Sequence, residues 1–89
     1  MNWQIVFRKR FFHDLASLPT DVRNDIEKLL RMPIENPFLL PSLKKLGGHT
    51  DKFRLRFGEY RVGLTIDKRN RQVVIERCAP RKDIYRTWP

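Results

Sequence analysis

The segment from Lys52 to Arg61 alternates basic and apolar side chains up to a glycine and resumes beyond it, which is the pattern of a β-hairpin. Because successive side chains of a strand point to opposite faces, the two kinds of residue are sorted onto different sides. The apolar side consists of Phe53, Leu55 and Phe57. The basic side consists of Lys52, Arg54 and Arg56, with neighbouring cations roughly 7 Å apart. We therefore expect a strand that joins a core through one face and meets an anionic partner through the other.

The turn at Gly58-Glu59 fits a two-residue loop of type II′, which prefers glycine at its first central position. So tight a loop predicts the cross-strand pairs Phe57–Tyr60, Arg56–Arg61, Leu55–Val62 and Arg54–Gly63. Beyond the turn, the apolar face continues with Val62, Leu64 and Ile66.

The predicted pairing places two arginines opposite each other, at a cost of a few tenths to about 1 kcal/mol. Acceptance of this cost favours an anion between Arg56 and Arg61. Gly63 leaves room for a bulky group to approach the sheet closely. The alternative is an ordinary solvated face, on which Lys and Arg protect a sheet edge.

The 89 residues have the composition of a small folded domain with a high positive charge. A net charge of +9 draws a chain electrostatically to nucleic acid or to an acidic protein. Cys78 is the single cysteine, which excludes an internal disulfide and suits a reducing cytosol; we expect a buried structural thiol. No apolar run is long enough for a membrane span, and the first residues lack the order of a secretory signal. These features predict one domain over residues 1–89 that acts in the cytoplasm without membrane contact.

Two helices are predicted after a short first strand over residues 2–7. The first helix covers residues 11–18 and ends at Pro19. Thr20 is the expected N-cap of the second helix. The apolar face of that helix consists of Val22, Ile26, Leu29 and Leu30.

A proline-rich connector over residues 33–41 separates these helices from the remaining strands. Those strands are expected over residues 52–57, 60–66 and 72–78, and one helical turn over 81–86. The order predicts an α+β fold in which an antiparallel sheet carries the helical hairpin on one face. The other, cationic face is left free for a partner.

Metal catalysis is not expected, because His13, His49 and Cys78 lack ligand spacing, and no cofactor motif is present. A cluster of cations and phenols remains as the candidate chemistry. RNA carries its own nucleophile, the 2′-hydroxyl, so an enzyme need only orient it, accept its proton and stabilise the added charge. Arginine binds phosphate oxygens bidentately, and a tyrosine among cations should have a lowered pKa and serve as a general base. Plain RNA binding needs the same cations, so composition does not separate cleavage from binding.

Three runs of this chain are informative together: Leu43-Lys44-Lys45-Leu46, Phe53-Arg54-Leu55-Arg56-Phe57-Gly58-Glu59-Tyr60-Arg61-Val62 and Arg81-Lys82-Asp83-Ile84-Tyr85. In these runs, and in its order of strands and helices, the chain resembles the RelE/ParE toxin superfamily of toxin–antitoxin modules. RelE-like members cut mRNA in the ribosomal A site, whereas ParE-like members poison DNA gyrase. The full set of basic residues together with Tyr85 favours the RelE-like activity, with the gyrase inhibitor as the alternative. A simple nucleic-acid-binding module is a third possibility.

The resemblance implies roles for individual residues. The implied catalytic set is Lys52, Arg54, Arg61, Arg81 and Tyr85. Tyr85 would be the general base, Arg81 the acid or leaving-group stabiliser, and the other three would hold the scissile phosphate. Further RNA contacts are expected from Lys44, Lys45, Arg56, Lys82 and Arg86.

Two residues near the C-terminus depart from the pattern or add to it. Pro80 stands where several relatives have a histidine, which leaves a mechanism based on tyrosine and cations. Trp88 is expected to pack against the fold, with stacking on a base as the alternative. The implied partners are a cognate antitoxin, the ribosome and mRNA, with operator DNA bound only through the antitoxin complex.

Overall fold

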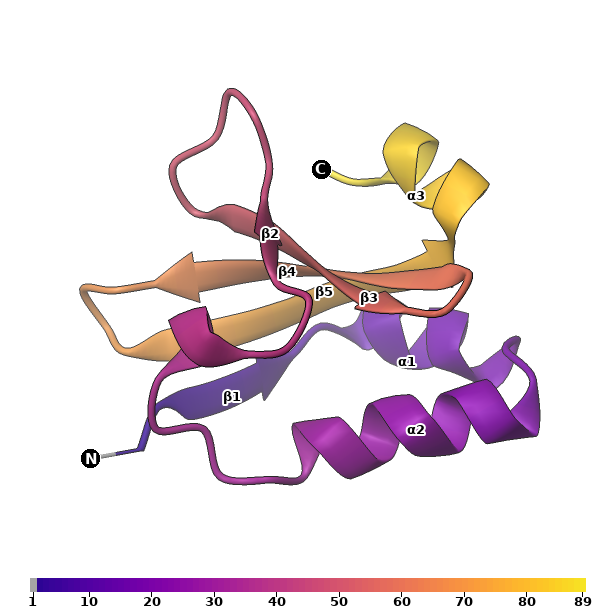
Figure 1. The fold of residues 1–89 in the computed structure, drawn as a ribbon, viewed down its shortest axis with the longest axis horizontal. Coiled ribbons are helices and arrows are strands. Elements are labelled where there is room, and N and C mark those ends of the chain that lie inside the picture. Colours follow the sequence, from indigo (N-terminus) through magenta and orange to yellow (C-terminus); the bar gives the residue numbers. More distant parts are fainter. Residues whose placement is uncertain (1) are drawn as a thin grey trace.

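The computed structural model describes residues 2–89, except for the Thr87 side chain; Met1 of the predicted domain lies outside this range. The strands are β1 (Gln4–Phe7), β2 (Lys44–Lys45), β3 (Lys52–Phe57), β4 (Tyr60–Asp67) and β5 (Gln72–Pro80). The helices are α1 (Lys9–Ala16), α2 (Thr20–Leu30) and α3 (Arg81–Thr87), with a 3₁₀ turn η1 at Pro37–Leu39. One sheet has the strand order β1-β5-β4-β3-β2, with α1 and α2 on one side and α3 on the other (Figure 1). The predicted α+β fold is confirmed.

The sheet is mixed, which corrects the prediction of a wholly antiparallel one. Strands β2 to β5 pair antiparallel, but β1 runs parallel to β5, with Gln4 opposite Gln72. Side-chain alternation is the same in either direction, so it does not encode the direction of an edge strand. The chain between β1 and β5 contains α1, α2 and three further strands, so it is far longer than the dozen or so residues that a parallel pairing needs. Lys44-Lys45, expected in a connector, adds a short strand beside β3.

The hairpin register matches the prediction at each of the four pairs. Phe57 faces Tyr60, Arg56 faces Arg61, Leu55 faces Val62, and Arg54 faces Gly63. Gly58 has a φ of +58°, as the first central position of a type II′ turn requires. Local turn chemistry therefore determines which cations face one another.

Helix α2 starts one residue earlier than predicted. Thr20 is its first residue rather than its N-cap, and Pro19 occupies the cap position without a side-chain hydrogen bond. The Pro19 carbonyl oxygen accepts from the Arg23 amide at 2.9 Å, so the proline itself supplies the first helical acceptor. The predicted apolar face is confirmed, since Ile26 and Leu30 are buried against the sheet.

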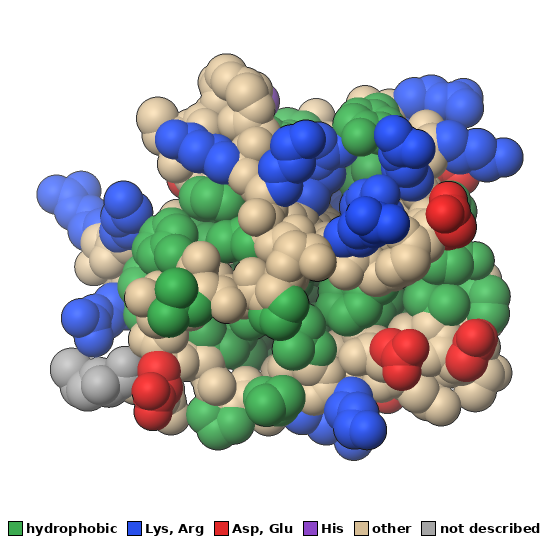
Figure 2. Space-filling model, in the orientation of Figure 1, with side chains coloured by type: hydrophobic (Ala, Val, Ile, Leu, Met, Phe, Trp, Pro, Cys, Tyr) green, Lys and Arg blue, Asp and Glu red, His purple; other side chains and the backbone are tan. Residues whose placement is uncertain are grey.

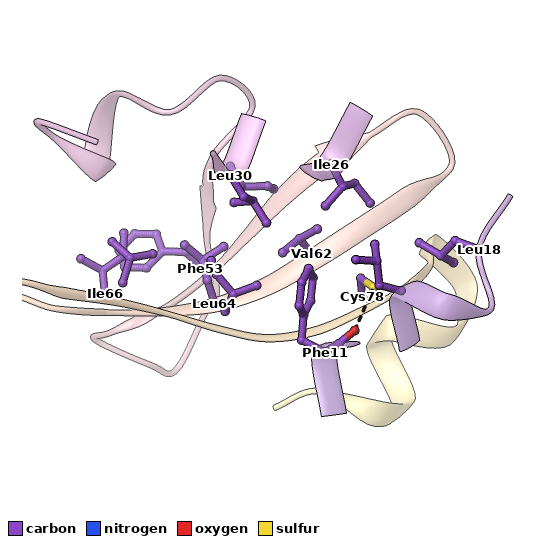
Figure 3. Packing of buried hydrophobic residues seen from close by; sticks show 13 residues of the cluster. Phe11, Leu18, Ile26, Leu30, Phe53, Val62, Leu64, Ile66 and Cys78 are labelled. Carbon is purple, nitrogen blue, oxygen red and sulfur yellow. Dashed lines mark hydrogen bonds between the residues drawn. The ribbon is translucent and has the colours of Figure 1, made fainter. Parts of the chain in front are cut away.

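The core lies between the sheet and the pair α1 and α2 (Figure 3). A bulge in β5 shapes it: Leu64 pairs with Ile75 and Gly63 with Arg77, which leaves Glu76 as an extra residue. In a regular strand, residues three positions apart point to opposite faces. Because the bulge adds one residue between them, Ile75 and Cys78 both point into the core. The predicted buried thiol is confirmed, and burial raises the pKa of Cys78 to about 12.

An ion pair fastens α1 to β5 beside this bulge. Arg77 Nε donates to Asp14 Oδ2 at 2.7 Å, and the Cys78 amide donates to the same oxygen at 3.1 Å.

None of the helices described over residues 2–89 is both long and apolar enough to cross a membrane.

Candidate functional site

The short helix α3 is attached to the open face of the sheet at both of its ends. At the start of α3, the Arg81 amide donates to the Glu59 carbonyl oxygen at 2.8 Å, which ties the helix to the hairpin turn. Beyond its end, Trp88 is only 7% exposed and lies over Gly63, where a Cβ atom would come within 2.6 Å of Trp88 Cδ2. The room predicted at Gly63 is therefore filled by the chain's own indole. The predicted packing role of Trp88 is confirmed.

A pocket of about 220 Å³ opens between α3, the hairpin and the loop before β2. Its lining residues are Ser42, Lys44, Arg54, Leu55, Arg56, Arg61, Arg81 and Tyr85. Lys and Arg side chains gather over this side of the molecule, where α3, β2 and β3 lie, while acidic side chains are seen along α2 (Figure 2). Residues that are far apart in sequence thus form one cationic concavity with a phenol in it.

Tyr85 lies directly beside the guanidinium of Arg54. The Arg54 Cζ atom is 4.4 Å from the centroid of the Tyr85 ring, a cation–π arrangement. Hydrogen bonding by Arg54 and then by Arg81, together with their charges, lowers the pKa of the Tyr85 phenol. Tyr85 is 58% exposed, so this phenol is open to a ligand. The phenol of Tyr85 is therefore more easily ionised than that of an ordinary tyrosine.

Arg61 is held over the hairpin turn by the backbone. Its Nη1 atom donates to the carbonyl oxygens of Gly58 at 2.7 Å and of Tyr60 at 3.0 Å. Desolvation, followed by the charges of Arg56 and Arg81, lowers the pKa of Arg61. The positive charges of Arg56 and Arg81 therefore repel that of Arg61, and an anion bound in the pocket would relieve this repulsion.

Lys52, predicted as catalytic, lies outside this pocket. Its Nζ atom donates to Thr65 Oγ1 at 2.7 Å and is 3.5 Å from Glu76 Oε2, while the Thr65 hydroxyl donates to the same carboxylate. Glu76, the extra residue of the β5 bulge, is thus the anionic partner of Lys52. No local sequence pattern predicts this pairing.

The remaining predicted RNA contacts are divided between the pocket and its surroundings. Lys44 and Arg56 line the pocket. Lys45 is exposed and pairs opposite Phe53, Lys82 lines a separate hollow, and Arg86 Nη2 is 3.8 Å from Asp83 Oδ1. Sequence reasoning missed Ser42, which sits in the loop with a φ of +60° and carries no recognisable sequence signal. Within residues 2–89, no group of three or more His, Cys, Asp or Glu side chains is placed to hold a metal ion.

Comparison with curated proteins finds a relative that matches this chain over almost the whole length of both. The chain is 31% identical over 90 residues to toxin RelE3 of Methanocaldococcus jannaschii, covering 97% of this chain and 99% of the relative. No family model matches the sequence.

Comparison with solved structures finds the same fold. The toxin–antitoxin complex RelB-RelE of Methanococcus jannaschii contains a chain that superposes with a TM-score of 0.75 at 27% identity, covering 94% of this chain and 99% of that one. The isolated RelE toxin of E. coli superposes with a TM-score of 0.71 at 20% identity, covering 96% and 93% of the two chains. The second likeness is one of fold alone.

Proposed function

This chain belongs to the RelE toxin family, and from that membership and the geometry around Tyr85 we propose that it is a ribosome-dependent endoribonuclease that cuts translated mRNA. The observation that carries the proposal is one phenol, with a lowered pKa, in a pocket lined by the guanidinium groups of Arg54, Arg61 and Arg81. Such a site combines a base with a binding place for a phosphate, which is what 2′-hydroxyl attack requires.

In the proposed reaction, Tyr85 as phenolate takes the proton of the 2′-hydroxyl. The O2′ atom attacks the adjacent phosphorus and the bond from phosphorus to O5′ breaks, leaving a 2′,3′-cyclic phosphate and a 5′-hydroxyl. Arg54 and Arg61 bind the non-bridging oxygens as their charge grows, each as a planar fork of donors. The protein groups in this reaction all line the pocket.

Arg81 stabilises the leaving O5′ atom rather than acting as the acid. A guanidinium group does not give up its proton in proteins, so it donates hydrogen bonds to the departing oxygen while solvent supplies the proton. The hydrogen bond between the Arg81 amide and Glu59 fixes the start of α3, and with it the position of this side chain. Lys52 lies beyond the pocket and adds positive potential to the same face, next to Arg54 on β3.

The proposed partners are mRNA on the ribosome and a cognate antitoxin. The solved relative from Methanococcus jannaschii is a complex of RelE with its antitoxin RelB. An acidic or amphipathic antitoxin segment would neutralise this +9 toxin by occluding the Tyr85 pocket or displacing α3. Operator DNA would be bound only through that complex. The proposed place of action is the cytoplasm.

Primer extension on mRNA from cells briefly induced for this protein tests the activity. Tyr85→Phe is the matched control, because it removes the hydroxyl but keeps the ring that stacks on Arg54. Cuts confined to translated frames, present in the wild type and lost in Tyr85→Phe, are the expected result. Intact mRNA despite growth arrest would overturn the proposal. It would instead support ParE-like inhibition of gyrase, the alternative that the RelE relatives do not favour.

A further inference from the structure

A second hollow lies on the flank of the open sheet face, apart from the Tyr85 pocket. Its volume is about 560 Å³. One side is formed by Arg8, Lys9 and Arg10 at the junction of β1 and α1, and the other by Trp88 and Pro89. Lys52, Glu76 and Arg77 complete the lining. The proposed cleavage reaction uses none of the cations at the β1–α1 junction.

The charges of this hollow are unevenly paired. Glu76 is engaged by Lys52 and Thr65, and Arg77 by Asp14. Among the ion pairs found over residues 2–89, none involves Arg8, Lys9 or Arg10, and all three residues are exposed. The hollow therefore presents a net positive charge that the protein's own carboxylates leave available.

The second hollow and the Tyr85 pocket are neighbours along β3. Lys52 lines the hollow and Arg54 lines the pocket. Two residues apart on a strand, these side chains share the open face at a spacing of roughly 7 Å. A single RNA strand that crosses this face can therefore contact both.

We propose that the Arg8–Arg10 hollow binds the backbone of the RNA substrate on one side of the scissile phosphate, as an extension of the Tyr85 pocket. The inference rests on the proposed function, since it names a further part of the same substrate. Arg8 and Arg10 bind flanking phosphates electrostatically, and the buried Trp88 together with Pro89 forms the opposite wall. The hollow sets how long a stretch of RNA the toxin grips and takes no part in the chemistry.

Binding of 2′-O-methyl RNA, which lacks the free nucleophile, tests this assignment without cleavage. Fluorescence anisotropy would compare a trinucleotide with a single strand of about 10 nucleotides, a length typical of single-strand sites. The test variant is Arg8→Ala/Arg10→Ala, whose side chains cap no helix and form no ion pair among the described residues. The matched control is Lys28→Ala/Arg31→Ala, which removes the same charge from exposed positions at α2 on the other side of the sheet.

The loss of two phosphate contacts makes the plot of log association constant against log salt concentration less steep by about 1.4. It weakens binding about 25-fold at 0.1 M salt. We expect this loss for the longer RNA with the test variant, little change for the trinucleotide, and the wild-type slope with the control. Equal losses in both variants would show a general charge effect and overturn the inference. Binding of an acidic peptide in the hollow without binding of RNA would overturn it too. Frame-specific cleavage that Tyr85→Phe abolishes, with unaltered RNA binding by the test variant, would leave the proposed function standing and remove this extension.

Discussion

Replacement of Gly63 by alanine tests whether the contact with Trp88 fixes α3 on the sheet. The added Cβ atom would lie 2.6 Å from Trp88 Cδ2 and 2.7 Å from Cε3. Carbon atoms in contact prefer about 3.5–4.0 Å, so the indole has to move by about 1 Å. The backbone of Gly63 accepts alanine, because its φ lies outside the left-handed region. The indole contact is therefore the expected source of the cost.

The protein can respond to this clash in two ways. Expulsion of the indole would expose much of the 150–250 Å² that a buried aromatic covers, worth about 4–6 kcal/mol as an upper estimate. Retention of the indole in a strained position costs about 1–3 kcal/mol, as overpacking does elsewhere. Because the strained position costs less than expulsion, we expect Trp88 to stay over the sheet. The free energy of unfolding should then fall by about 1–3 kcal/mol.

Urea unfolding followed by circular dichroism measures this loss, and a double-mutant cycle assigns it. In a Trp88→Ala background, Gly63→Ala should cost less than about 0.5 kcal/mol, since the clashing atoms are gone. Gly47→Ala is the matched control, because no atom lies within 4 Å of its added Cβ. That control should be neutral or stabilising by up to about 1 kcal/mol.

An equal loss from Gly63→Ala with and without Trp88 would refute the reasoning, because the cost would then arise in the strand itself. A functional consequence follows from the same contact. Tyr85 lies in the segment that Trp88 holds down, so cleavage by Gly63→Ala should fall more than the folded fraction does.

Further expectations concern the pocket, the thiol and the partly buried ion pair between Asp14 and Arg77. Because Arg54 is the largest cause of the lowered pKa of Tyr85, Arg54→Ala should move the rising limb of the cleavage rate to higher pH; an unmoved pH profile from single-turnover assays would contradict the base role. The pKa of about 12 keeps Cys78 as a thiol, so alkylation at pH 8 should be at least roughly a thousandfold slower in the native protein than in urea, and rapid native labelling would contradict its burial. Asp14→Ala leaves the half-buried Arg77 guanidinium without its carboxylate, and urea unfolding should show a loss of about 1–3 kcal/mol; a loss below about 0.5 kcal/mol would mean that solvent replaces the pair.

The hairpin was predictable because its information is local. Alternation between Lys52 and Phe57 specifies the two faces, and Gly58 specifies a turn that sets the register, so each of the four predicted pairs is found. The same locality explains why the fold class followed from periodicity. It also limits the result, since neither the parallel direction of β1 nor the start of α2 at Thr20 is encoded by side-chain alternation.

For the candidate site, the sequence predicts most of the residues that take part but not how they are arranged in space. The resemblance to RelE/ParE toxins indicates four residues that the structure brings to one pocket: Arg54, Arg61, Arg81 and Tyr85. Lys52 looked equivalent to Arg54 in sequence, but the bulge at Glu76 gives it a carboxylate partner outside that pocket. A bulge depends on how β5 meets β4, and no pattern within one strand reveals it.

The amino-acid sequence is enough to predict which strand faces are charged and which are apolar, the hairpin register and the α+β class. It also shows that many cations and a late tyrosine are present. The faces, the register and the class follow from the period of side chains along a strand or helix and from the conformational preference of one glycine. Tertiary packing is what groups certain cations in one pocket, brings Trp88 over Gly63 and places Arg8 to Arg10 at the border of a second hollow. These features arise where segments distant in sequence pack together, so their distances are set by the assembly of strands and helices and not by any local pattern.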